Sequence, residues 1–292
     1  MLEHPFSFID VSMSSPDYLL IGHVSKDLTA HGPRLGGTVT FGSLMANALG
    51  YRPGILTSAS DDFLPFLSPL NSFEIKCVGS SETTTFTNQY TPAGRLQKLS
   101  GRAAILSTET LPLNWAKPRI VHFAPIADEI GPEMTRLFPD SVSIATPQGW
   151  MRIWDKEGLV KFKVWESASE VLPRLTALVM SIDDVQGDET LILEFARLVP
   201  VLAVTRSHDG ARIYIEGKPQ DLPAPVIQEI DPTGAGDIFA VCFGVGLLEF
   251  GDPYRAATFA ILIASDSVTR HGIDSIPGQD TIQQIRTKTQ RS

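Results

Sequence analysis

Short apolar runs alternate along the chain with longer segments of helical hydrophobic period. This order predicts a mostly parallel sheet with helices on its faces, which is an α/β fold class. The predicted strands are residues 18–22, 55–57, 120–123, 142–145, 177–181 and 201–205. The predicted helices are residues 37–49, about 126–138, 188–199 and 236–250. A last long helix is predicted to be capped by Asp252, opened by Pro253 and ended by Gly272.

Two polar stretches interrupt this alternation. Residues 81–98 are rich in Thr and have strand propensity without a helical period. Residues 24–37 are also polar and lie between turns that we expect to face a ligand. Together they predict a small β-lid, formed by approximately residues 24–37 and 81–98, on a single α/β domain that spans residues 1–292.

Composition narrows the classes of function. The chain has 292 residues, 43% of them hydrophobic, and a net charge of −9. This profile is typical of a globular protein and argues against a nucleic-acid partner, which would need a basic face. No apolar run is long enough to cross a bilayer, and we see no secretory pattern. We therefore expect no membrane partner. The chain has only two cysteines, Cys77 and Cys242, which lie far apart, so we expect reduced thiols and a cytoplasmic location.

The segment 231–239, Asp-Pro-Thr-Gly-Ala-Gly-Asp-Ile-Phe, carries the candidate chemistry. It follows an extended stretch and opens an apolar helix, and Gly234 and Gly236 permit a tight turn close to a ligand. The N–H groups of Gly234, Ala235, Gly236 and Asp237, free at a helix start, suit a transferring phosphoryl group. The Asp237 carboxylate is placed to accept the proton of an attacking alcohol. On residue types alone, a plain strand–helix turn in which Asp237 only complements the helix dipole is an equal alternative.

This segment resembles the motif D-T/P-x-G-A-G-D-x-F of the ribokinase family, the PfkB carbohydrate kinases. Other segments are similar to family features in the same order: 22–27 to the first-strand turn, 35–37 to the Gly-Gly substrate loop, 83–86 to a lid strand, 203–210 to the nucleotide segment and 264–277 to the adenine side. The resemblance implies a ribokinase-like fold, a twisted, mostly parallel sheet flanked by helices with a small β-lid. It also implies an ATP-dependent kinase with a small polyol or sugar as acceptor.

The resemblance implies roles for individual residues. Asp237 is expected to be the catalytic base, with Gly234, Ala235 and Gly236 as an anion hole. The expected nucleotide-binding residues are Thr205, Ser207, Gly210 and Gly272, and the expected acceptor-binding residues include Asp27, Gly36 and Gly37. The family's N-x-x-E segment is here Ser-Ile-Asp-Asp at 181–184, so Asp184 is expected to bind Mg²⁺ indirectly, through water. ATP and Mg²⁺ are the expected cofactors, and a monovalent cation near Asp231 is a further implication.

Within the family, the pattern is most similar to inositol kinases. The similar segments are Leu-Gly-Gly-Thr-Val-Thr-Phe at 35–41, the segment 181–184 and Gln-Gly-Trp-Met-Arg at 148–152. An inositol offers several hydroxyls and no ring oxygen, so Asp27, Asn88, Gln148 and Arg152 are candidates to hydrogen-bond it. Ordinary lid or loop polarity for Asn88 and Gln148, and a surface salt bridge for Arg152, stay open as alternatives.

Some positions depart from the family pattern. Arg206 and Ser207 stand where a small residue and Gly are common, and Thr38 and Phe41 stand where sugar kinases often carry Lys and Asn. The loss of polar groups at 38 and 41 argues against ribose as the acceptor. The alternatives are a kinase of another sugar, a sugar acid or a nucleoside, and a non-catalytic relative that only binds a ligand. Monomer and homodimer both stay open.

The histidines show no metal-binding spacing, and we assign none a catalytic role. For His23, a structural role in a turn is favoured over a ligand contact. His122 is placed to face the pocket from a strand end, and His271 to lie near the nucleotide.

Overall fold

The computed structural model describes residues 15–30, 32–91 and 94–291. Within them, nine strands form a large sheet in the order β15-β14-β13-β12-β9-β8-β1-β4-β5. These strands are β1 (Tyr18–Ile21), β4 (Pro53–Ala59), β5 (Glu74–Gly79), β8 (Ile120–Phe123), β9 (Val142–Ala145), β12 (Ala177–Ser181), β13 (Val201–Thr205), β14 (Ala211–Ile215) and β15 (Lys218–Leu222). From β13 to β5 all neighbours are parallel, whereas β14 and β15 add an antiparallel edge. All six predicted strands are present, so this part of the prediction is confirmed.

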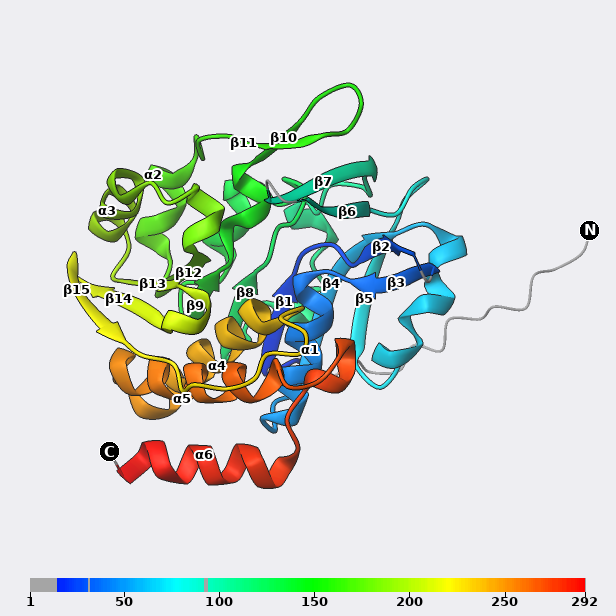
Figure 1. Cartoon of the computed structure of the whole chain (residues 1–292). Helices are drawn as coiled ribbons and strands as arrows, with labels where there is room; N and C mark the ends of the chain where they lie inside the picture. The colour runs from blue at the N-terminus through cyan, green and yellow to red at the C-terminus, as the bar shows by residue number, and fades with distance from the viewer. Residues whose placement is uncertain (1–14, 31, 92–93, 292) are drawn as a thin grey trace, which may run out of the picture.

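The large sheet is buried on both faces. Alternate residues of β1 belong to two different cores, Tyr18 and Leu20 to one and Leu19 and Ile21 to the other. Successive side chains of a strand point to opposite faces, so the sheet needs helices on both sides. Figure 1 shows α1, α4 and α5 on one side and α2 and α3 on the other. The helices are α1 (Thr38–Ala48), α2 (Ala168–Val171), α3 (Glu189–Leu198), α4 (Ala235–Phe250), α5 (Pro253–Ser267) and α6 (Gln279–Arg291).

The predicted start of the last long helix is confirmed, but its predicted end is wrong. Asp252 caps α5 by accepting hydrogen bonds from the N–H groups of Tyr254 and Arg255. The helix ends at Ser267, before Gly272, and just beyond its end the Thr269 hydroxyl donates to the Asp266 carbonyl at 2.7 Å. A further helix that was not predicted, α6, packs against α5 (Figure 1).

The helix predicted at about 126–138 is not formed. Only a short 3-10 helix, Pro132–Leu137, occurs there. The backbone N–H groups of Ile126 and Ala127 donate to the Glu129 carboxylate, and Asp128 has a φ of 58°. A side chain therefore satisfies the amides that a helix start would leave open, and the backbone turns away from helical geometry.

The polar ranges form a second, four-stranded sheet in the order β3-β2-β6-β7. Its strands are β2 (Ser25–Thr29), β3 (Gly32–Gly36), β6 (Thr85–Thr91) and β7 (Gly94–Gly101). A hairpin of β10 (Arg152–Trp154) and β11 (Val160–Phe162) lies near its β7 edge (Figure 1). The function of the second sheet as a lid, and the single domain over 1–292, stay predictions. Among the described residues, no helix is both long and apolar enough to span a membrane.

Candidate active site

The predicted site residues follow the carboxyl ends of neighbouring parallel strands. Gln148 follows β9, Asp184 follows β12, and Thr205 is the last residue of β13. Asp27 lies on β2, which follows β1 after a short turn. In open α/β sheets, ligands bind in the crevice outside this edge, so the four residues are placed where a ligand is expected.

Asp237 lies in the first turn of α4 and is partly buried. Burial raises the pKa of its carboxyl to about 6. A hydrogen bond from the Thr38 side chain lowers this pKa. The negative charges of Asp184 and Asp27 raise it further, and the positive charge of Arg152 lowers it. Thr38 therefore contacts Asp237, and the charges of Asp27, Asp184 and Arg152 act on it. A carboxylate with this pKa accepts a proton more readily than an ordinary one.

Thr38 is a further candidate site residue, which the sequence pattern marked only as standing in the place of a family Lys. It is the first residue of α1 and is 7% exposed. Its hydroxyl is a hydrogen-bond partner of the Asp237 carboxyl. In the sequence, Thr38 is marked only by its place directly after Gly36 and Gly37. The fold shows that α1, which begins at Thr38, meets the start of α4.

Asp184 is held by the protein through both carboxylate oxygens. The Ser181 N–H donates to Oδ2 at 2.8 Å, and the Gln148 amide donates to Oδ1 at 3.3 Å. Burial raises the pKa of Asp184. A carboxylate engaged in this way suits a metal contact through water better than direct coordination, and Gln148 contacts this carboxylate.

Arg152 links the large sheet to the second sheet. Its Nη1 donates to the Ile126 carbonyl at 3.0 Å, and its guanidinium lies 5.5 Å from the centre of the Phe86 ring on β6. Its charge also lowers the pKa of Asp184 and Asp237.

Two glycines permit close approaches in the site. Gly234 has a φ of 81°, and a Cβ there would lie 2.5 Å from the buried ring of Phe41. A Cβ at Gly36 would collide with the carboxylate of Asp27, which also accepts a hydrogen bond from Ser25 at 2.8 Å. A side chain at Gly234 would be strained and would meet Phe41, and one at Gly36 would displace Asp27.

One amide of the predicted anion hole is already occupied. The Ala235 N–H donates to the Pro232 carbonyl at 3.1 Å, so the expectation that it is free is wrong. This bond closes the turn that precedes α4. The N–H groups of Gly236 and Asp237 belong to the first turn of α4, where the helix itself supplies no acceptor.

The predicted nucleotide-binding residues occupy two turns. The first joins β13 to β14, with Ser207 at a φ of 52° and Gly210 at 91°. Thr205 opens it and donates to the Met180 carbonyl at 3.4 Å. In the second, the Gly272 N–H donates to Asp231 at 3.2 Å and brings the start of the 231–239 segment beside the end of α5.

Part of the chain matches a known protein family. Residues 182–279 match the family model described as pfkB family carbohydrate kinase. The predicted recognition and the predicted class of enzyme, a phosphotransferase with an alcohol group as acceptor, are confirmed.

Curated relatives and solved structures that are similar to this chain are kinases. The chain is 26% identical to an inositol 3-kinase of Zea mays over 87% of this chain and 73% of the relative, and 26% identical to one of Oryza sativa subsp. japonica over 87% and 69%. A pyrophosphate-dependent kinase of the ribokinase family, solved with a pyrophosphate analogue and myo-inositol, aligns with a TM-score of 0.77 at 20% identity, over 91% of this chain and 99% of that one. A ribokinase from Thermotoga maritima aligns with a TM-score of 0.72 at 18% identity, over 93% and 99%. The ribokinase-like fold is therefore confirmed.

Three of the described histidines differ in their environments. His23 is fully buried and bonds to Thr84 and to the Ala104 carbonyl, which is a structural role in a turn. His122 is buried between Tyr18 and Thr146, and burial lowers its pKa to about 3. His271 is exposed and lies 3.4 Å from Asp231, beside Gly272.

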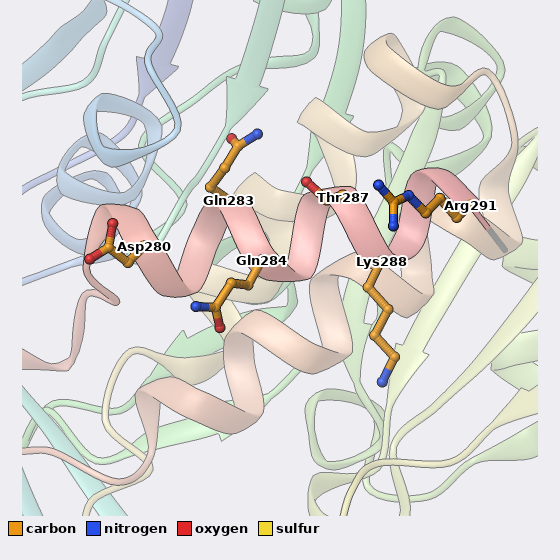
Figure 2. A pocket seen from close by; sticks show the side chains of 6 residues that line it. All are labelled: Asp280, Gln283, Gln284, Thr287, Lys288 and Arg291. Carbon is orange, nitrogen blue, oxygen red and sulfur yellow. The ribbon is translucent and has the colours of Figure 1, made fainter.

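Asn88 accepts a hydrogen bond from Gln97 at 3.0 Å within the second sheet. A shallow hollow on α6 is lined by Asp280, Gln283, Gln284, Thr287, Lys288 and Arg291, and none of the predicted site residues lines it. Figure 2 shows these side chains spread around one helix instead of converging on a cavity. Among the described residues, no group of three or more His, Cys, Asp or Glu side chains is arranged to hold a metal ion.

Proposed function

We propose that the protein transfers the γ-phosphoryl group of ATP to a hydroxyl of an inositol or a similar polyol. The observation that carries the proposal is the Asp237 carboxyl at the start of α4, with a pKa of about 6 and the charges of Asp27, Asp184 and Arg152 close by. The inositol 3-kinases that align with most of this chain support an inositol as the acceptor.

In the proposed reaction, Asp237 accepts the proton of the acceptor hydroxyl. The hydroxyl oxygen forms a bond to the γ-phosphorus, and the bond from that phosphorus to the bridging oxygen of ATP breaks, which releases ADP. The first-turn amides of Gly236 and Asp237 stabilise the charge on the transferred group. Mg²⁺, when bound, neutralises phosphate charge, and Asp184 would hold it through water.

Pyrophosphate is an alternative phosphoryl donor, because some structural neighbours are pyrophosphate-dependent kinases. Ile230 and Ile273 are 53% and 42% exposed. They flank Asp231 and Gly272, which are joined by a hydrogen bond. Exposed apolar side chains at this turn suit the face of a nucleobase and offer no favourable contact to pyrophosphate, which favours ATP.

The proposal is tested with the purified protein, ATP–Mg²⁺ or pyrophosphate–Mg²⁺, and a panel of inositols, ribose and other sugars, sugar acids and nucleosides. We expect the highest kcat/KM with ATP and an inositol. Preference for pyrophosphate would refute the donor, and preference for another acceptor class would refute the inositol. Binding of ATP without turnover of any acceptor would support the non-catalytic alternative.

The base is tested with Asp237→Asn. We expect kcat to fall by about 10²-fold or more, because a general base contributes at least this much. Asp280→Asn is the matched control, since Asp280 also lies in the first turn of a helix, α6, and is exposed. Turnover near the wild-type rate in Asp237→Asn would show that Asp237 is not the base.

A further inference from the structure

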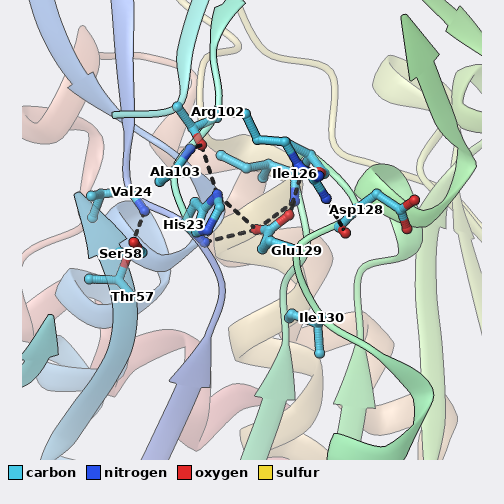
Figure 3. Close-up of polar contacts among 12 residues, drawn as sticks. His23, Val24, Thr57, Ser58, Arg102, Ala103, Ile126, Asp128, Glu129 and Ile130 are labelled. Carbon is cyan, nitrogen blue, oxygen red and sulfur yellow. Dashed lines mark hydrogen bonds and ion pairs between the residues drawn. The ribbon is translucent and has the colours of Figure 1, made fainter. Parts of the chain in front are cut away.

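A buried polar cluster lies beside the site and has no part in the reaction proposed above. We call His23, Thr84, Arg102 and Glu129 the Glu129 cluster. Figure 3 shows Glu129 pointing toward His23 and the backbone at Ile126, with Arg102 above them. His23 and Glu129 are fully buried. A buried charged group is costly unless it is paired and hydrogen-bonded, so its contacts indicate what it does.

Glu129 fixes the backbone of two separate loops. Its Oε1 accepts the N–H of His23 at 2.8 Å, in the turn after β1. The Ile126 N–H donates to both oxygens at 3.0 Å, and the Ala127 N–H donates to Oε2 at 2.7 Å, in the loop after β8. Arg102 holds the same loop from the other side, through the carbonyls of Ala127 at 2.8 Å and Asp128 at 2.6 Å.

Both loops lead directly to the acceptor side of the site. Glu129 holds the Ile126 N–H, and the Ile126 carbonyl accepts a hydrogen bond from Arg152 at 3.0 Å. The His23 carbonyl lies so close to Gly37, at the start of α1, that a Cβ there would be 2.6 Å away. A displacement of Glu129 would therefore move Arg152 and the turn that carries the acceptor loop.

The cluster also holds the base of the second sheet. The His23 ring bonds to the Thr84 hydroxyl at 2.7 Å and to the Ala104 carbonyl at 2.8 Å. The Ala103 N–H donates to the same Thr84 hydroxyl at 3.0 Å. These residues adjoin one end of β6 and β7, the strand pair that places Phe86 against Arg152.

We propose that Glu129 is a positioning residue for the acceptor: it fixes Arg152, the turn before Asp27 and the base of the second sheet relative to one another. The inference rests on the proposed function, because it needs an acceptor bound between Asp27 and Arg152. The donor turns at 205–210 and 272 make none of the contacts described for the cluster. The kinetic effect is therefore confined to the acceptor.

Glu129→Gln tests this proposal. A carboxamide keeps the size of the side chain. Both oxygens of Glu129 accept backbone N–H groups, so the NH₂ group of Gln would face a backbone N–H in either orientation. We expect kcat/KM for the acceptor to fall by about 10- to 100-fold, as small misplacements of substrate-positioning groups do. The KM for ATP should not change.

Asp252→Asn is the matched control, since Asp252 also accepts two backbone N–H groups, at the start of α5. It should leave both KM values unchanged. Thr84→Val is a milder second variant if Glu129→Gln fails to fold. We expect kcat/KM for the acceptor to fall by about 2- to 10-fold, because the hydroxyl that bonds to His23 and Ala103 is lost.

The outcomes separate this inference from the proposed function. Equal losses for donor and acceptor, or no loss in a folded Glu129→Gln or Thr84→Val, would overturn the positioning role while the kinase stands. If the wild type prefers another acceptor, the same comparison is made with that acceptor. A wild-type protein without phosphoryl transfer to any acceptor would overturn the proposed function, and the inference with it.

Discussion

The hydrogen bond between Thr38 and Asp237 leads to a prediction about pH dependence. The Thr38 side chain lowers the pKa of the Asp237 carboxyl, against the larger opposing effect of burial. Thr38→Val keeps the shape of this 7%-exposed side chain and removes its hydroxyl. Asp237 would then be harder to ionise, because its charged form loses a hydrogen-bond donor in a partly buried place.

The size of the effect follows from the energy of one charge-assisted hydrogen bond. Such a bond contributes about 1.5 to 3 kcal/mol, and one pKa unit corresponds to about 1.4 kcal/mol. Water at this partly accessible carboxyl would replace some of the lost interaction. We therefore expect the pKa of Asp237 to rise by about one unit above its present value of about 6.

The assay is the pH profile of kcat/KM for the acceptor, which reports the pKa of an essential base in the free enzyme. Activity needs ionised Asp237, so it falls as the pH drops through this pKa. Thr38→Val should move this acid limb upward by about one pH unit, while Thr38→Ser should leave it in place. An unmoved or lowered limb in a folded Thr38→Val would refute either the hydrogen bond or the role of Asp237.

Three further predictions concern the same residues. The folded pKa of Asp237 lies above its ordinary value of 3.8, so its stabilising effect is complete below about pH 4 and is lost as the pH rises through about 6. At pH 8 the free energy of unfolding of Asp237→Asn should therefore exceed that of the wild type by about 1 to 2 kcal/mol, and near pH 4 the two free energies should be equal. Urea titration at both pH values measures the difference, and a stability gain that does not depend on pH would contradict this prediction. Gly36→Ala should raise the acceptor KM without changing the ATP KM, since the new methyl group displaces Asp27; steady-state kinetics with each substrate varied would check it. Gly234→Ala should lower kcat and also destabilise the protein by about 1 kcal/mol or more, because φ is 81° and Phe41 occupies the space; single-turnover kinetics and thermal unfolding would measure both.

Local pattern was sufficient for much of the fold. The buried strands are short apolar runs, and α3, α4 and the start of α5 follow from hydrophobic period and caps within a few residues. The Gly-rich turn at 231–239 pointed to the start of α4 and to Asp237 for the same reason. The helix predicted at about 126–138 does not form, because the Glu129 carboxylate accepts the N–H groups of Ile126 and Ala127 and also that of the distant His23.

The sequence by itself determined the α/β class, the order of the strands along the chain and the residue types that phosphoryl transfer requires, because these depend on near neighbours. Only the tertiary structure decided that Thr38 meets Asp237, that Gln148 meets Asp184, and that Arg152 lies between Ile126 and Phe86. Each of these contacts joins segments far apart in the chain. Their geometry is set by the packing of helices on the sheet, and the raised pKa of Asp237 arises from the burial that this packing creates.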